Sequence, residues 1–414
     1  MKQRRTVGPL AVLLVYGIAL TGISVPAAAA AMATAFGTKC SKVGAVSWQG
    51  KTKLRCTRVG GRLLWKVVAP AKPIPGPQAE PDSMLGTACG DPGHELLNAA
   101  GPIRCTDGVW VSLTPAKDSV ASRAYRNLMK QYWANPASKM RLRIVSDTET
   151  AYVVAAIERG IRAADRLWSV PVPHQPMPVV IAHNAQSLSA QAAALGLSAD
   201  SVLLELEAQE AAYGGCGQGN FMSSLDRPWL SFCLGFAPID DSPAAQTFGN
   251  VGAHEFTHMA QFSLMHGSHG ERSCLRIAPW LEEGLAAYAQ MSLGSVSGSG
   301  GDLRKYWVPT LDSTTATLAD YNYTVPVGAR LPYALGLFAS EALYAVQGTG
   351  VADKVLAACG TGLKFSAAFK KATGHTLEQW TPVLSAYVES VKARRELTLP
   401  ELQALRAKAF GTNG

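Results

Sequence analysis

The sequence predicts an α+β protein whose main domain has a mixed-sheet half followed by a helical half, with two small disulfide-stapled β modules before it. Three observations lead to this prediction. After about residue 118, strand-like segments alternate with helix-period segments, and helical patterns dominate beyond residue 234. Upstream of that point, one pattern of Cys, Gly and Trp occurs twice. The N-terminus carries a single long apolar segment, and no second one follows.

Composition narrows the class of protein further. The chain has 414 residues, of which 48% are hydrophobic and 16% charged, and this excludes a collagen, a disordered tail and a polytopic membrane protein. Lys and Arg number 38 against 30 Asp and Glu, but the basic residues are scattered. We therefore expect no nucleic-acid partner. For an exported protein, the mild basic excess favours cell-wall polymer or anionic lipid.

Residues 1–33 have the layout of a signal peptide. Three basic residues precede an apolar stretch from about residue 8 to residue 33, which contains Ala31-Met32-Ala33 as one cleavage motif. This layout predicts a secreted or cell-surface protein with no membrane contact beyond the signal segment. An uncleaved membrane anchor is the alternative, because the apolar stretch is long.

The cysteines predict a duplicated module. Cys40 and Cys56 are 16 residues apart, as are Cys89 and Cys105, and both pairs share the flanking Gly-Thr, Arg-Cys-Thr and later Gly and Trp. Units this short bury too little surface to fold unaided, so we expect one disulfide within each copy. An even count of eight cysteines in an oxidising compartment also favours disulfides over a thiol-rich metal site.

These modules set the domain boundaries. Residues 34–68 form the first copy, residues 69–82 a Pro-rich linker and residues 83–116 the second copy, which leaves residues 117–414 for the main domain. The modules are either binders of cell-wall polymer or a stalk. Aromatic residues at strand ends are compatible with both roles.

The main domain begins with an α/β pattern. Residues 141–146 and 177–182 are predicted strands on either side of a helix at residues 151–168, and residues 229–234 are a further predicted strand. The last four cysteines give two more expected pairs, Cys216 with Cys233 and Cys274 with Cys359. The sequence therefore predicts four intramolecular disulfides.

A zinc-binding pattern stands at the junction of the two halves. His254 and His258 are four residues apart, so a helix places both on one face, with Glu255 beside them as a base for a water molecule. The alternative is two surface histidines on a solvated helix. A second predicted helix at residues 279–288 argues against that alternative, because it carries adjacent carboxylates and catalytic zinc needs a third protein ligand.

Around these two segments the chain resembles the gluzincins, the H-E-x-x-H zinc peptidases of the thermolysin and aminopeptidase superfamily, also called peptidase MA-like. In many of them the second helix reads W-L-x-E-G-x-A, and residues 280–286 here read W-L-E-E-G-L-A. The resemblance implies that Glu283 is the third ligand, that Glu282 is its neighbour and that one Zn²⁺ binds per chain. It covers about residues 151–393 in architecture, and sequence identity is visible only around the two helices.

Two departures from the family pattern matter. The gap of 24 residues between His258 and Glu283 is longer than is common in that group, and an inserted loop pinned by a disulfide would accommodate it. Ala287 stands where thermolysin has an Asp that supports a zinc-binding histidine, so another residue must orient the histidines here. His266 and His269 in the loop are alternative third ligands, or simple exposed loop residues.

Tyr333 is the candidate for stabilising a transition state. It follows Pro332 at the start of a predicted helix, where several gluzincin families carry a tyrosine that faces the metal. The alternative role is that of a core or helix-cap tyrosine.

The sequence thus predicts an exported zinc metallopeptidase that acts on peptide or protein substrates. Glu255 would take a proton from the activated water and pass it to the leaving amine, while the metal and Tyr333 stabilise the oxyanion. The strand at residues 229–234 is expected to be an edge strand that aligns an extended peptide. Two alternatives stay open: a non-catalytic cell-surface binding protein on a peptidase-like fold, and a zinc amidase acting on cell-wall peptides.

Overall fold

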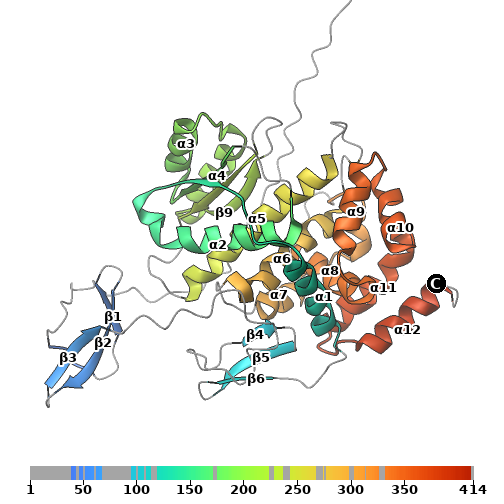
Figure 1. The fold of residues 1–414 in the computed structure, drawn as a ribbon, viewed down its shortest axis with the longest axis horizontal. Helices are drawn as coiled ribbons and strands as arrows, with labels where there is room; N and C mark the ends of the chain where they lie inside the picture. Colours follow the sequence, from blue (N-terminus) through green and yellow to red (C-terminus); the bar gives the residue numbers. More distant parts are fainter. Residues whose placement is uncertain are drawn as a thin grey trace, which may run out of the picture. The chain divides into compact units, whose positions relative to one another are not determined.

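The computed structural model describes most of the chain between residues 39 and 411 (Figure 1). The described residues are 39–42, 46–49, 52–59, 62–67, 95–98, 101–106, 109–112, 119–170, 175–222, 228–235, 243–266, 274, 277–297, 303–312, 314–325 and 332–411. The predicted signal segment and Pro-rich linker lie outside these residues. The chain divides into two compact units, one over residues 19–79 and the other over residues 1–18 and 80–414.

The first module is a three-stranded antiparallel sheet. Its central strand β2 (Thr52–Val59) pairs with β1 (Val46–Gln49) and with β3 (Arg62–Val67). The predicted disulfide between Cys40 and Cys56 is present. Cys56 lies opposite Trp65 across the β2–β3 pair, and both side chains are buried, so the disulfide and one indole make up most of this small core.

A second sheet with the same strand order follows. It consists of β4 (Glu95–Asn98), β5 (Gly101–Thr106) and β6 (Val109–Ser112), all antiparallel. Cys105 lies opposite Trp110, as Cys56 lies opposite Trp65 in the first sheet. The two sheets therefore share one strand order and one Cys–Trp register. The predicted partner of Cys105, Cys89, lies outside the described residues.

The main domain opens with a four-stranded mixed sheet in the order β7-β8-β10-β9. The strands are β7 (Leu142–Ser146), β8 (Met177–Ala182), β10 (Trp229–Leu234) and β9 (Gly217–Met222). β7, β8 and β10 are parallel, and β9 runs antiparallel to β10. β8 and β10 are buried along their whole length, which explains their continuous apolar runs.

The position of β10 corrects one prediction. The strand at residues 229–234 was expected at the edge, but β9 pairs with its outer side, so β9 is the edge strand on that side among the described residues, and β7 is the other edge. β9 carries little strand signal in its own residues, because glycines such as Gly217 and Gly219 are depleted in strands. The predicted disulfide between Cys216 and Cys233 is present beside this strand pair.

Helices cover the sheet and then form the second half of the domain. The first four are α1 (Val120–Ala134), α2 (Ala151–Trp168), α3 (Ala185–Ala194) and α4 (Asp200–Tyr213). The remainder are α5 (Pro243–His266), α6 (Pro279–Ser297), α7 (Leu303–Asp312), α8 (Tyr333–Gln347), α9 (Val351–Gly360), α10 (Phe365–Thr373), α11 (Leu377–Lys392) and α12 (Leu399–Phe410). The predicted order of a sheet-bearing half followed by a helical half is therefore confirmed. Within the described residues, each helix is too short or too polar to cross a membrane.

Local signals in the sequence set several helix starts. Ser119, Asn184, Thr376 and Thr398 precede α1, α3, α11 and α12, and each side chain accepts a hydrogen bond from the backbone amide three residues later. Such caps satisfy backbone donors that the first helical turn leaves without partners.

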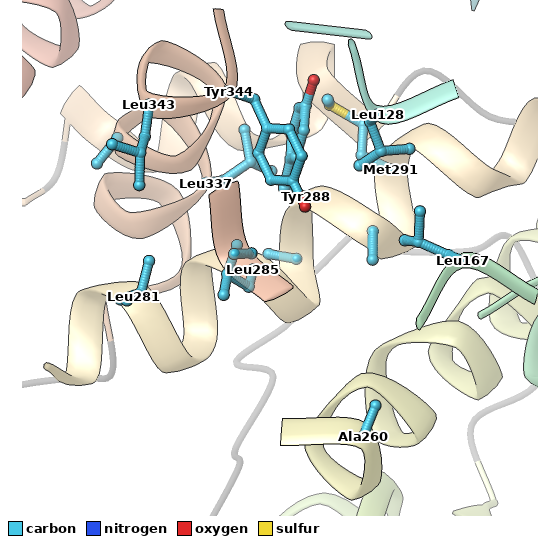
Figure 2. Close-up of a cluster of buried hydrophobic side chains, with 14 of the residues drawn as sticks. Leu128, Leu167, Ala260, Leu281, Leu285, Tyr288, Met291, Leu337, Leu343 and Tyr344 are labelled. Carbon is cyan, nitrogen blue, oxygen red and sulfur yellow. The ribbon is translucent and has the colours of Figure 1, made fainter. Parts of the chain in front are cut away.

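The core of the helical half lies between α6 and α8 (Figure 2). Leu285 and Tyr288 of α6 face Leu337 and Tyr344 of α8, and the two tyrosine rings lie 5.5 Å apart between centroids. α5 packs against both α2 and α6. The helical half therefore holds α5 and α6 side by side.

A glycine contact fixes the crossing of α6 and α8. A Cβ atom on Gly284 would overlap the backbone of Gly336, and one on Gly336 would overlap the backbone of α6 at Trp280. Because the backbones touch, no larger residue fits at either position. Gly284 directly follows Glu283, so this crossing also fixes how far along α6 the Glu283 carboxylate lies and to which side of the helix it points.

The remaining predicted disulfide joins the segment before α6 to the end of α9. Cys274 and Cys359 are bonded, with their Cα atoms 5.3 Å apart. Most of the loop between α5 and this cysteine, including His269, lies outside the described residues.

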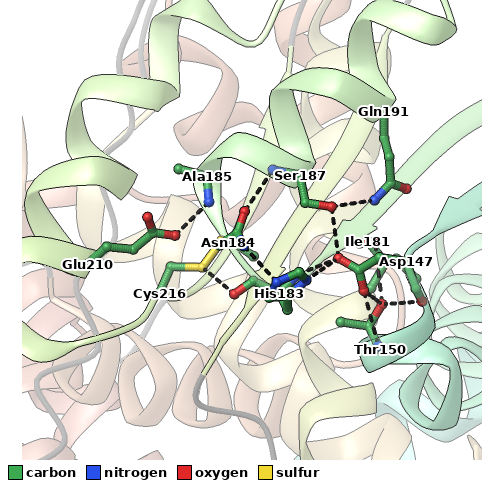
Figure 3. Close-up of polar contacts among 11 residues, drawn as sticks. Asp147, Thr150, Ile181, His183, Asn184, Ala185, Ser187, Gln191, Glu210 and Cys216 are labelled. Atoms are coloured by element: carbon green, nitrogen blue, oxygen red, sulfur yellow. Dashed lines mark hydrogen bonds and ion pairs between the residues drawn. A yellow bond between two sulfur atoms is a disulfide. The ribbon is translucent and has the colours of Figure 1, made fainter.

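A polar network closes the carboxyl ends of β7 and β8 (Figure 3). One Asp147 oxygen accepts hydrogen bonds from the backbone and the ring Nδ1 of His183 and from the Ser187 hydroxyl, while the other accepts from Thr150. Asn184 caps α3 with its oxygen and donates through its nitrogen to Nε2 of His183. Both oxygens of Asp147 are therefore satisfied by donors of the protein itself.

Candidate metal centre

The two histidines of the sequence motif lie on one face of α5 and are buried. His254 and His258 are each 5% exposed, and their Nε2 atoms are 3.2 Å apart. The four-residue spacing along the helix produces this pairing, since residues i and i+4 stand one above the other. The alternative of two solvated surface histidines is therefore wrong.

The third member of the cluster comes from α6. Glu283 is 1% exposed, and its Oε2 lies 3.7 Å from Nε2 of His254 and 3.5 Å from Nε2 of His258. These three residues form a buried group that could hold a metal ion. Glu282 is half-buried, and its backbone carbonyl accepts a hydrogen bond from Gln261 of α5.

Hydrogen bonds at the far side of each ring determine which nitrogens face the cluster. Nδ1 of His258 lies 2.9 Å from Oε1 of Gln261, and Nδ1 of His254 lies 3.0 Å from Oε1 of Gln290. An amide oxygen only accepts, so each Nδ1 carries the proton and each Nε2 presents a lone pair. With the carboxylate of Glu283, three acceptor atoms then converge on one point, which is unfavourable unless a cation lies between them.

The spacing of the three donor atoms fits a tetrahedral zinc ion. Nitrogen and oxygen ligands lie about 2.0–2.1 Å from zinc, so the edges of a regular tetrahedron around it measure about 3.3–3.4 Å. The observed separations of 3.2, 3.5 and 3.7 Å are close to that value. Two imidazoles and one carboxylate also form a donor set typical of catalytic zinc.

The electrostatics of the cluster agree with a demand for positive charge. Burial alone would lower the pKa of His258, but the carboxylate of Glu283, with smaller contributions from neighbouring carboxylates, raises it. Burial would likewise raise the pKa of Glu283, but a positive charge on His258, and to a smaller extent on His254, lowers it when those rings are protonated. The site therefore favours an ionised carboxylate with a cation beside it.

Glu255 lies against the edge strand. Its side chain is 3% exposed, and a Cβ atom on Gly219 of β9 would lie 2.7 Å from its Cγ and 2.9 Å from its Oε1. A residue other than glycine at this position would displace the carboxylate. Glu255 and the backbone of β9 are thus in direct contact beside the histidines.

Tyr333 begins α8 next to the cluster. Its ring centroid lies 5.8 Å from that of His254, and the ring stacks against Trp307 of α7 with the centroids 5.7 Å apart. Burial, followed by the negative charges of three glutamates led by Glu283, raises the pKa of Tyr333 well above its ordinary value. Its hydroxyl therefore stays protonated at neutral pH and can donate a hydrogen bond.

The structure thus brings His254, His258 and Glu283 into one cluster and places Tyr333 beside it. The side chain of His266, an alternative ligand, is not among those described. Sequence reasoning missed Gln261, Gln290, Trp307 and Gly219. Helical spacing could have revealed the glutamines, because one stands three residues after His258 and the other seven after Glu283, on the same faces as those ligands.

Comparison with known proteins gives no relative for this chain. No protein-family model, curated protein or solved structure matches it.

Proposed function

We propose that the chain is an exported zinc metallopeptidase with a gluzincin-like domain, in which His254, His258 and Glu283 bind one zinc ion. The observation that carries the proposal is the convergence of two imidazole lone pairs and one buried carboxylate at near-tetrahedral spacing. The proposed substrate is a peptide or protein.

The proposed chemistry assigns one role to each neighbouring side chain. Bound zinc would supply Lewis acidity for attack of water on a peptide carbonyl. Glu255 adjoins His254 on α5 instead of sharing its face, so it serves proton transfer, taking a proton from water and passing it to the leaving amine. The protonated hydroxyl of Tyr333 donates a hydrogen bond to the developing oxyanion.

The edge strand supports a role in substrate alignment. β9 is one of the two edge strands of the sheet among the described residues, and its Gly219 touches Glu255. An extended peptide that paired with β9 would bring its carbonyl groups to the carboxylate. This assignment replaces the one made from sequence for residues 229–234.

Export is supported by two features. The disulfides Cys40–Cys56, Cys216–Cys233 and Cys274–Cys359 belong in an oxidising compartment, and the N-terminal segment has the order of zones of a signal peptide. We propose a secreted or cell-surface location, with the N-terminal modules as candidate binders of cell-wall polymer.

The proposal is tested by measuring zinc content and hydrolysis on the purified chain. We expect one zinc per chain and hydrolysis of casein or short peptides, and the Glu255→Gln variant should keep its zinc while turnover falls by about two orders of magnitude or more. Cleavage of peptidoglycan fragments alone would favour the amidase. A zinc-free wild type, or full activity in Glu255→Gln with contaminating protease excluded, would favour the binding protein.

A further inference from the structure

The metal cluster has an outer layer made of two neutral amides. Gln261 accepts from His258 and Gln290 accepts from His254, so both histidines are supported through Nδ1. The gluzincin resemblance implies a supporting carboxylate at the position of Ala287, but the side chain here is a methyl group, which cannot accept a hydrogen bond. The orientation of both histidines must therefore depend on residues that the family pattern does not supply.

Gln261 makes a second contact that a carboxylate could not make. Its Nε2 donates to the backbone carbonyl of Glu282 at 2.8 Å, while its Oε1 accepts from His258 at 2.9 Å. The carbonyl only accepts, so this contact fixes which end of the amide faces the histidine. Gln261 is also 1% exposed, so no water replaces either partner. One side chain thus ties a ligand of α5 to the residue that precedes the ligand of α6.

Gln290 makes a simpler contact. Among the described residues its hydrogen bond is the one to Nδ1 of His254, and its side chain is half-buried. Only the acceptor oxygen is used in that bond. A carboxylate at this position could accept the same proton, and partial exposure to water would solvate its charge.

We infer that Gln261 and Gln290 are positioning residues of the metal centre, that both hold a histidine lone pair toward the metal, and that only Gln261 requires an amide. This inference rests on the metal site of the proposed function and deepens it. Outer partners of metal-binding histidines typically change metal affinity by about ten- to a hundred-fold. An amide and a carboxylate should therefore be interchangeable at one position and not at the other.

The test is the zinc dissociation constant of the full chain, measured by competition with a chromophoric chelator at neutral pH. Gln261→Met and Gln290→Met should each weaken zinc binding by about ten- to a hundred-fold. Gln290→Glu should bind zinc as tightly as wild type or tighter, because a carboxylate accepts more strongly from Nδ1. Gln261→Glu should bind at least as weakly as Gln261→Met, since its oxygen would face the Glu282 carbonyl oxygen.

A matched control is Gln347→Met. Gln347 also donates to a backbone carbonyl in the helical half, that of Thr373, and it has no contact with the metal cluster. This variant should bind zinc as wild type does. Thermal unfolding of the metal-free proteins shows whether each variant folds, and if the Gln261 variants do not fold, the Gln290 variants decide.

The outcomes separate this inference from the proposed function. Wild-type affinity in both methionine variants would overturn the inference while leaving the zinc site intact, and so would an equal response of Gln261→Glu and Gln290→Glu. Wild-type affinity in Gln290→Met is sufficient to overturn it when the Gln261 variants do not fold. A wild-type chain that binds no zinc would instead overturn the proposed function itself.

Discussion

Two clusters in the main domain combine histidine with carboxylate, and they differ in how their hydrogen bonds are satisfied. In the cluster of Asp147 and His183, each carboxylate oxygen accepts from more than one donor, and Nε2 of His183 accepts from Asn184 (Figure 3). In the cluster of His254, His258 and Glu283, three acceptors point at one another. The first network satisfies its carboxylate without an added ion, whereas the second is a group that could hold a metal ion.

The contrast shows that residue types alone do not define a metal site. Asp147 and His183 are 2.6 Å apart, closer than any pair in the candidate centre, yet the proton on Nδ1 of His183 already satisfies the carboxylate. The direction of each lone pair separates the two cases, and it depends on what the other ring nitrogen bonds. A search for metal sites should therefore follow the outer hydrogen bonds as well as the distances between ligands.

The largest effect is expected from removing one member of the cluster of His254, His258 and Glu283. Glu283→Ala should lower zinc affinity by more than about a hundred-fold, beyond the range of outer-partner changes, because it removes a ligand. Glu282→Ala is the matched control on the next residue and should keep its zinc. Elemental analysis after dialysis measures both variants. A zinc-loaded Glu283→Ala beside an empty Glu282→Ala would reverse the assignment.

A smaller effect is expected from a change at Tyr333, which lies beside the cluster. Tyr333→Phe removes only the hydroxyl, so turnover should fall on the order of ten- to a thousand-fold while zinc content and KM change little. Steady-state kinetics on a short peptide measure the change. Trp307→Phe keeps an aromatic ring against Tyr333 and serves as a milder comparison. An unchanged kcat in Tyr333→Phe would mean that this tyrosine has only a structural role.

Asp353 is intermediate between the two clusters in how its hydrogen bonds are satisfied. One of its oxygens accepts from Gln131 at 2.7 Å, and the other is buried with no donor among the described residues. Burial raises the pKa of Asp353 to about 7, and the hydrogen bond from Gln131 opposes that rise only in part. The folded protein therefore binds this proton more tightly than the unfolded chain does.

The raised pKa of Asp353 makes the stability of the folded protein depend on pH. Stability should fall as the pH rises from about 4 to about 7, because ionising Asp353 is harder in the folded state. Asp353→Asn should remove this loss and be more stable than wild type at pH 8, by up to about 4 kcal/mol, with no gain at pH 4. Urea unfolding of both proteins at the two pH values measures the difference. A gain of equal size at both values would contradict the titration of Asp353.

The smallest effect is expected from a change in the network of Asp147 and His183. Asp147→Asn keeps the shape of the side chain but replaces an acceptor with a donor that faces other donors, which should destabilise the protein by about 1–2 kcal/mol at neutral pH. Hydrogen bonds from His183, Thr150 and Ser187 outweigh burial and lower the pKa of Asp147, so this difference should vanish well below pH 4. Zinc content should not change. Thermal unfolding followed by elemental analysis tests both statements, and zinc loss would mean that the clusters are coupled.

Local patterns in the sequence were sufficient for much of this protein. The bounds of β8, β10 and α2 match their predicted ranges, because an uninterrupted apolar run or a helical period is a property of the segment itself. The spacing of His254 and His258 likewise placed them on one face of a helix. Equal spacing and shared flanks identified the Cys40–Cys56 pair, which is a short-range closure within one module.

Only the tertiary structure decided which groups meet across segments. β9 was missed because its glycines disfavour a strand, and it forms because β10 offers a partner and Gly219 leaves room for Glu255. Gln261 and Gln290 are ordinary polar residues in the sequence. Gln290 meets His254, and the amide nitrogen of Gln261 meets the carbonyl of Glu282, through the packing of α5 against α6, in which the crossing of α6 and α8 at Gly284 and Gly336 fixes the rotation of α6. Such contacts depend on helix crossings between distant segments, which no local periodicity encodes.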